Sequence, residues 1–116
     1  AHVHLLGIGG DPMRARLTAL NTETADAVLY GAGNARATLM AGFTTVRDLG
    51  GEARAIRALR DAVERGDVVG PTIVNAGAPI SATGGHGDPL NGIAEPFAHA
   101  VAETVENTCD GAADCT

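Results

Sequence analysis

Apolar residues recur at intervals of three and four along residues 22–42, TETADAVLYGAGNARATLMAG, and predict an amphipathic helix that ends at Gly42. The same spacing predicts a second helix over residues 52–65, with Gly66 as its C-terminal stop. A third helical pattern covers residues 96–105. The segments between these helices follow a different pattern.

Short apolar and β-branched runs lie before and between the helices. They are the opening AHVHLLG, FTTVRDL at residues 43–49 and PTIVNA at residues 71–76. Strands that alternate with helices are typical of βαβ units, in which right-handed crossovers place the helices outside a parallel sheet. No linker divides the chain, so residues 1–116 are predicted to form one domain or one piece of a domain.

The composition fits a globular α/β protein and argues against several classes of partner. Hydrophobic residues make up 45% of the 116 residues and charged residues 19%, enough for one hydrophobic core. No apolar run approaches the ~18–20 residues that a membrane span needs. The net charge is −6, with one tyrosine, two phenylalanines and no tryptophan. The sequence therefore offers neither a basic nor a stacking surface for nucleic acid.

The two cysteines, Cys109 and Cys115, lie near the end of the chain. Their spacing matches neither a CxxC motif nor a zinc-ribbon knuckle. We therefore expect two reduced thiols in a cytoplasmic protein. A disulfide or a metal-binding pair is the alternative.

Two histidines separated by one valine stand at the start of the chain. Because side chains alternate along a strand, His2 and His4 are expected to project together, with Val3 opposite. Two imidazole nitrogens presented in this way can hold one metal ion at about 2.0–2.1 Å each. Parallel α/β sheets place their sites at carboxyl strand ends, which favours a metal site here. The alternative is an unrelated pair, one histidine buried and hydrogen-bonded and the other exposed.

Asp48 is predicted to emerge at the carboxyl end of the strand over residues 43–49. From there its carboxylate could orient a metal-bound histidine through a hydrogen bond. Alternatively, Arg47 and Asp48 cap the following helix or form surface ion pairs.

The glycine-rich stretch GAPISATGGHGDP, residues 77–89, follows the third predicted strand. A segment of this length with little structure of its own is usually functional or disordered. Glycines around His86 allow its backbone to approach a ligand closely, and Asp88 lies two residues on, so both are candidate substrate contacts. The alternative is a mobile surface histidine. His99 lies in an alanine-rich helical run and is expected to be an ordinary surface or packing residue.

Two other kinds of site lack support. The run GIGG at residues 7–10 is followed by Pro12, where a dinucleotide-binding motif needs its third glycine, and we expect no strand-to-helix corner there. No GxSxG motif marks a nucleophilic serine.

Several of these stretches resemble the metal-dependent amidohydrolase superfamily. AHVHLLG is similar to the HxH that ends the family's first barrel strand, AGFTTVRDLGG to its second strand, and GPTIVNAGAPISATGGHGDP to its third strand and loop. NTCDGAADC resembles the helix entry that follows. The most similar branch contains imidazolonepropionase-like enzymes and Xaa-Pro dipeptidases. The resemblance covers most of the chain and is most specific where HxH, RDLGG and GGHGD occur in this order.

The resemblance implies an α/β fold, in which the chain is the first three βα units of an incomplete TIM-type (β/α)8 barrel. It implies that His2 and His4 bind one or two divalent metal ions, commonly zinc, which activate water to attack an amide carbonyl. The implied substrates are small amides such as Xaa-Pro-like dipeptides or N-acyl amino acids. We expect the full-length enzyme to be a cytoplasmic homo-oligomer, and its composition argues against nucleic-acid and membrane partners.

The chain also departs from the family pattern. A barrel needs about 250 residues, and the lysine that bridges two metals in this family is missing, since the eight basic residues are all arginine. We therefore expect Ala1 and Thr116 to be arbitrary boundaries and this segment alone to be inactive. The alternatives are a non-catalytic metal-binding module, an inactive paralogue, and a hydrolase of cyclic amides of the imidazolone type.

Overall fold

Three parallel strands form the sheet of this protein. The computed structural model describes residues 1–88, 90–102 and 107–115. In sheet order the strands are β1 (His2–Val3), β2 (Thr45–Asp48) and β3 (Thr72–Asn75). Both neighbouring pairs are parallel, as the alternation of strands and helices predicts.

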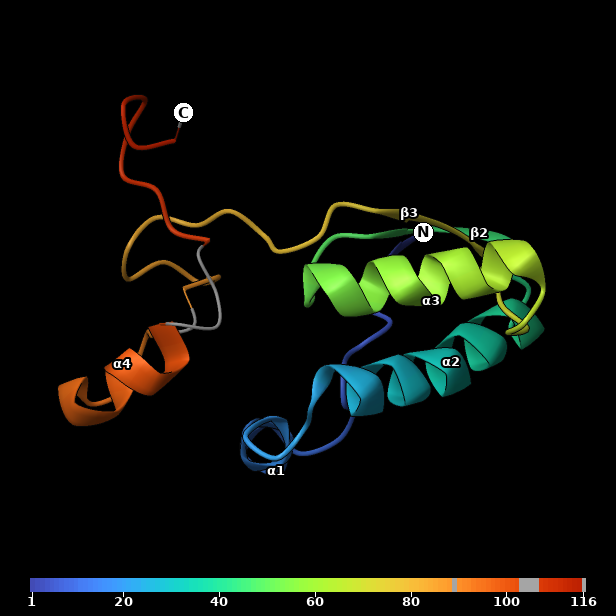
Figure 1. Ribbon diagram of the computed structural model, residues 1–116, viewed down its shortest axis with the longest axis horizontal. Helices are drawn as coiled ribbons and strands as arrows, with labels where there is room; N and C mark the ends of the chain where they lie inside the picture. Colours follow the sequence, from blue (N-terminus) through green and yellow to red (C-terminus); the bar gives the residue numbers. More distant parts are fainter. Residues whose placement is uncertain (89, 103–106, 116) are drawn as a thin grey trace. The chain divides into compact units, whose positions relative to one another are not determined.

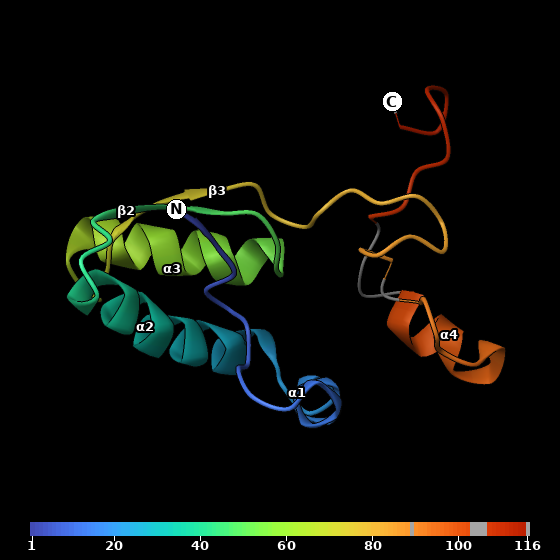
Figure 2. The ribbon, with the colours of Figure 1, turned by 180° about the vertical axis from the view of Figure 1, so that it is seen from behind.

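Two long helices connect the strands and cover one face of the sheet (Figure 1, Figure 2). They are α2 (Thr24–Met40), which precedes β2, and α3 (Ala53–Arg65), which precedes β3. Both lie within the ranges that the apolar spacing predicts. No helix in the described part of the chain is long and apolar enough to span a membrane.

Local signals in the sequence set the ends of these helices. At the start of α2 the side chain of Asp26 accepts a hydrogen bond from the backbone N–H of Glu23, which completes a capping box. α3 ends at Gly66, whose φ of 81° is left-handed and is favoured by glycine. The predicted stop at Gly66 is therefore confirmed.

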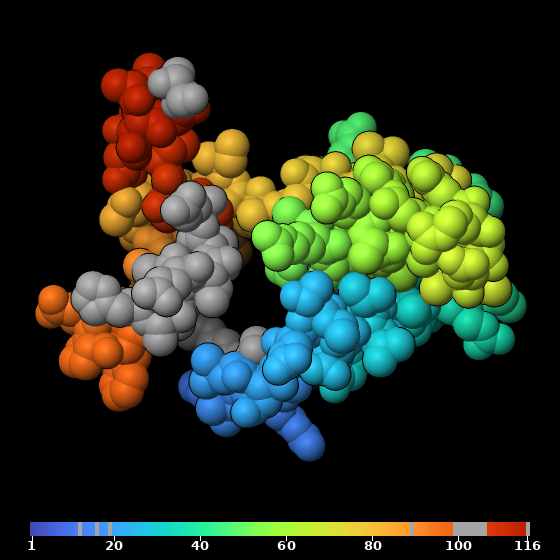
Figure 3. Space-filling model, viewed as in Figure 1, coloured from blue at the N-terminus to red at the C-terminus, as the bar shows by residue number. Residues whose placement is uncertain are grey.

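The hydrophobic core lies between the helices and the sheet. Its buried members are Leu5, Ala35, Val46, Ile56, Leu59 and Ile73. In the space-filling view α3 lies directly against α2 (Figure 3). Gly31 of α2 allows this approach, because a Cβ there would come within 2.9 Å of the Leu59 side chain and 2.8 Å of Leu6.

We expect Leu59→Ala to lower the free energy of unfolding by about 2–5 kcal/mol, because Leu59 is 0% exposed and its removal leaves a cavity. Leu29→Ala is the matched control. Leu29 is 73% exposed, so its change should stay within about 0.5 kcal/mol. Urea unfolding followed by circular dichroism measures both, and equal destabilisation would contradict the assigned core.

A short helix, α1 (Pro12–Ala19), lies where none was predicted. Pro12 occupies its first position, where proline is tolerated, and the Asp11 carboxylate accepts a hydrogen bond from the N–H of Arg14 at 2.9 Å. β1 ends at Val3, well before this helix, so α1 does not form the strand-to-helix corner of a dinucleotide-binding motif. Met13 and Leu17 are exposed, so the described side chains of α1 form no buried apolar face of the kind that predicts a helix from its sequence.

The described chain divides into two compact units, Ala1–Gly77 and Ala78–Thr116. In the second unit, Ser81 and Thr108 form an isolated parallel bridge. The Asn107 side chain donates hydrogen bonds to two backbone carbonyls of the glycine-rich loop. α4 (Glu95–Ala102) begins one residue before its predicted range. Residues 103–105 of the predicted helix, and the side chain of His99, lie outside what the structure describes.

Candidate metal centre at the end of β1

The imidazole rings of His2 and His4 lie beside one another. Their Nε2 atoms are 3.1 Å apart, and their ring centroids are 4.9 Å apart with the planes inclined at 60°. Both residues are exposed. His2 belongs to β1 and His4 follows its last residue. The expected side-by-side projection is therefore present, at the carboxyl end of the strand.

His4 is oriented by a backbone carbonyl that sequence reasoning did not identify. Its Nδ1 lies 3.2 Å from the carbonyl oxygen of Gly50. Because a carbonyl oxygen can only accept, Nδ1 carries the proton and Nε2 keeps its lone pair. The contact with His2 is consistent with this tautomer if His2 donates from its own Nε2. His4 is thus held with its free nitrogen toward His2.

Asp48 supports this arrangement through the backbone. It is 0% exposed. Its Oδ2 accepts from the N–H of Leu5 at 2.7 Å, and its Oδ1 accepts from the N–H of Gly50 at 3.3 Å. Leu5 follows His4, and Gly50 supplies the carbonyl that holds its ring. Asp48 therefore fixes the two backbone segments that position His4. Its proposed influence on a metal ligand stays a prediction.

Hydrogen bonds from α2 also hold the segment after His4. The side-chain amide of Asn34 donates to the carbonyl of Leu5 at 2.7 Å and to that of Gly7 at 3.0 Å. The segment after His4 is thus held from the helix as well as from β2. Only the folded chain reveals this contact, because 29 residues separate Asn34 from Leu5.

The distance between the two histidine nitrogens fits a shared metal ion. Two atoms that each lie about 2.0–2.1 Å from one zinc ion cannot be further apart than about 4.2 Å, and 3.1 Å falls within this limit. A tetrahedral ion needs four ligands. Within the described ranges, no group of three or more histidine, cysteine, aspartate or glutamate side chains is placed to hold a metal. The pair can supply two ligands of such a set.

His86 and Asp88 belong to the second unit. Asp88 is 8% exposed, and its carboxylate accepts from the N–H groups of Gly84 and Leu90, both at 2.8 Å. This carboxylate closes the glycine-rich loop on itself. His86 is exposed and makes no hydrogen bond or ion pair with another described residue. A substrate-contacting role for both residues stays a prediction.

The expectation of two reduced thiols was wrong, because Cys109 and Cys115 form a disulfide. A turn after Asp110 brings their Cα atoms to 5.1 Å, within the range that a disulfide requires. Asp110 also accepts a hydrogen bond from the N–H of Thr83. The side-chain and backbone hydrogen bonds with Thr83 lower the pKa of the Asp110 carboxyl. Within the stretch that resembled a helix entry, Thr108 forms the bridge with Ser81 and residues 112–114 form a turn.

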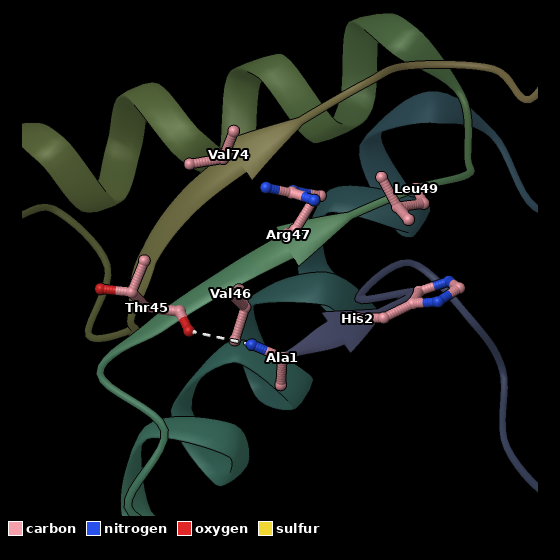
Figure 4. Close-up of a pocket in the computed structure, with 7 residues that line it drawn as sticks. All are labelled: Ala1, His2, Thr45, Val46, Arg47, Leu49 and Val74. Carbon is pink, nitrogen blue, oxygen red and sulfur yellow. Dashed lines mark hydrogen bonds between the residues drawn. The ribbon is translucent and has the colours of Figure 1, made fainter.

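Arg47 lies next to His2 on the face of the sheet that the helices leave open. The two residues are register partners in the β1–β2 pair, and both line a shallow hollow of about 410 Å³ (Figure 4). From the sequence, Arg47 was linked only to helix capping or surface ion pairs. The missing signal was the register, which sets its neighbour on β1.

The sequence matches the profile of the amidohydrolase family over residues 1–114. The chain belongs to this family. Amidohydrolase family members are generally metal-dependent, which agrees with a histidine pair built at a strand end. No curated protein matches the chain.

Solved structures of related amidohydrolases extend the comparison. An Xaa-Pro dipeptidase with methionine bound in its active site is 30% identical, with a TM-score of 0.74, over 95% of this chain and 26% of its own. A prolidase in complex with N-methylphosphonate-L-proline is 33% identical, with a TM-score of 0.66, over 95% and 26%. Another amidohydrolase is 28% identical, with a TM-score of 0.65, over 97% and 27%. The chain thus spans about a quarter of the length of these amidohydrolases.

Proposed function

We propose that this chain is the N-terminal segment of an amidohydrolase barrel, in which it forms the first three βα units. The proposed reaction is metal-dependent hydrolysis of an amide bond in a small substrate, such as an Xaa-Pro-like dipeptide or an N-acyl amino acid. The observation that carries the proposal is the convergence of the two Nε2 atoms at 3.1 Å, at the end of a parallel strand. The likeness to a dipeptidase and a prolidase supports the substrate class.

The burial pattern of β2 and the position of the helices support a place in a barrel. Along β2, Val46 and Asp48 are buried while Thr45 and Arg47 are exposed. α2 and α3 both cover the buried face (Figure 2). In a (β/α)8 barrel the helices form the outer ring and the opposite strand face looks inward. His2 and Arg47 would then point into the barrel.

In the proposed reaction, His2 and His4 would hold a divalent ion, zinc being the candidate, as one or two ions. Such an ion lowers the pKa of a bound water from 15.7 to about 7 and polarises a carbonyl. The residues of this chain fix the geometry. Gly50 keeps the proton on Nδ1 of His4, and Asp48 and Asn34 hold the backbone beside it.

The test is to express the complete gene that carries this chain, measure bound metal, and screen substrates. We expect hydrolysis of Xaa-Pro dipeptides or N-acyl amino acids that is lost on treatment with a chelator and restored by zinc. The screen should include a cyclic amide of the imidazolone type. If only that compound is hydrolysed, the substrate is a cyclic amide and the proposed linear substrates are wrong. Bound metal without turnover of any amide would contradict the proposed hydrolase.

A further inference from the structure

The side chains of Arg47 and His2 project from the same face of the sheet. They are paired in register on neighbouring parallel strands, which places their Cα atoms about 4.8 Å apart. The burial pattern of β2 agrees, since Val46 and Asp48 on either side of Arg47 are buried and Arg47 is exposed. The side chains of Arg47 and His2 therefore project from neighbouring strands on the open face of the sheet.

The hollow around Arg47 has apolar walls. Leu49 and Val74 line it together with Arg47 and His2. Figure 4 shows the Arg47 side chain between those of Leu49 and Val74, while the His2 ring projects beyond the end of β1.

Arg47 has no carboxylate partner in the described part of the chain. The ion pairs recorded there are Arg60–Asp61 and Arg65–Asp67. The adjacent Asp48 is buried on the opposite face, and its oxygens accept from backbone N–H groups. With respect to the described residues, the planar donors of the Arg47 side chain are free, and this fork matches a carboxylate in bidentate geometry.

We propose that Arg47 binds the carboxylate of the substrate and thereby restricts the substrates to N-acyl amino acids and dipeptides with a free carboxyl terminus. The inference rests on the proposed function, which puts the scissile amide at His2 and His4. In these compounds the carboxylate is one carbon away from the amide nitrogen. An amide at the histidines therefore brings its carboxylate within reach of a long side chain on the next strand.

The first test measures binding without turnover in the protein expressed from the complete gene. The probe is N-(phenylsulfonyl)-L-proline, in which a sulfonamide replaces the scissile amide, and its carboxamide serves as the uncharged analogue. Isothermal titration calorimetry compares the wild type with Arg47→Met, which keeps an unbranched apolar stem and loses the charged guanidinium. The control is Arg57→Met, because Arg57 is an exposed arginine on α3.

We expect Arg47→Met to weaken binding of the acid roughly tenfold or more, the loss of a charge-assisted bidentate contact. The carboxamide should bind equally to both proteins, and Arg57→Met should bind like the wild type. An equal loss for acid and carboxamide would overturn the inference, as would no binding of the acid to the wild type. If Arg47→Met does not fold, the affinities of the wild type for the two probes provide the test. Equal affinity for the acid and the carboxamide would also overturn the inference.

A second measurement separates this inference from the proposed function. With Xaa-Pro dipeptides as substrates, Arg47→Met should raise KM roughly tenfold and leave kcat within about threefold, because the contact is made in the bound substrate as well as in the transition state. If the acid binds in a way that depends on Arg47 but the protein hydrolyses no amide, the proposed hydrolase is wrong and the carboxylate site is retained. If Arg47→Met hydrolyses the dipeptides with an unchanged KM, the proposed carboxylate site is wrong and the proposed hydrolase is retained.

Discussion

Replacing both His2 and His4 by asparagine is expected to reduce the zinc content of the purified protein to background and to abolish amide hydrolysis. The variant removes the two nitrogens that converge at 3.1 Å. Loss of a group that merely orients a metal ligand already costs about 10–100-fold in metal affinity, so the loss of two direct ligands should cost more than about 100-fold. Metal content by mass spectrometry, together with turnover of an Xaa-Pro dipeptide, measures the effect in the protein expressed from the complete gene.

His86→Asn is the matched control for this experiment. His86 is also exposed and lies in the second compact unit. Its substitution should leave the zinc content at the wild-type level, whatever it does to substrate affinity. Full zinc occupancy in the His2 and His4 double variant would show that the pair is not a metal site, and the proposed mechanism would then be wrong.

Asp48→Asn is expected to lower the free energy of unfolding by about 2–4 kcal/mol. The side chain is fully buried, and its two oxygens accept hydrogen bonds from the N–H groups of Leu5 and Gly50. Asparagine has nearly the same volume but only one acceptor oxygen, so its amide N–H would face one of these donors. A buried donor without a partner costs about 1–3 kcal/mol, and a weakened second hydrogen bond adds to this. Urea unfolding provides the measurement.

Asp67→Asn controls for the loss of an acidic side chain as such. Asp67 pairs with Arg65 at 2.8 Å, and the two side chains are 60% and 62% exposed. Exposed ion pairs contribute at most about 1 kcal/mol. Similar stabilities for the Asp48 and Asp67 variants would contradict the role of Asp48 in holding the segment after β1. We also expect Asp48→Asn to lose zinc more readily, because Leu5 and Gly50 position His4.

The helices and strands were predictable where burial follows a simple period. α3 buries Ile56 and Leu59 on one face and ends at Gly66, so its apolar spacing and its C-terminal glycine both mark it. α2 was predicted equally well in extent, but its apolar face is not buried throughout. Leu29 and Met40 are more than 70% exposed, because only the part of α2 around Gly31 and Ala35 packs closely.

The failures have a common physical cause. The described side chains of α1 form no buried apolar stripe, so no helical spacing of apolar residues predicts this helix. The disulfide depends on a turn that brings Cys109 and Cys115 together, and their spacing in the sequence matches neither a CxxC motif nor a zinc-ribbon knuckle. In both cases the deciding interaction is local backbone geometry that leaves little trace in the pattern of residue types.

By itself the sequence determined the α/β alternation, the ends of α2 and α3, and the pairing of His2 with His4. These features depend on interactions within a few residues, on strand alternation and on helix periodicity. Tertiary structure alone decided which groups surround the histidines: the carbonyl of Gly50, the buried carboxylate of Asp48, and Arg47 as the neighbour of His2. Those contacts join segments more than 40 residues apart, and they depend on which residues of neighbouring strands are paired, which the pattern within one segment does not give.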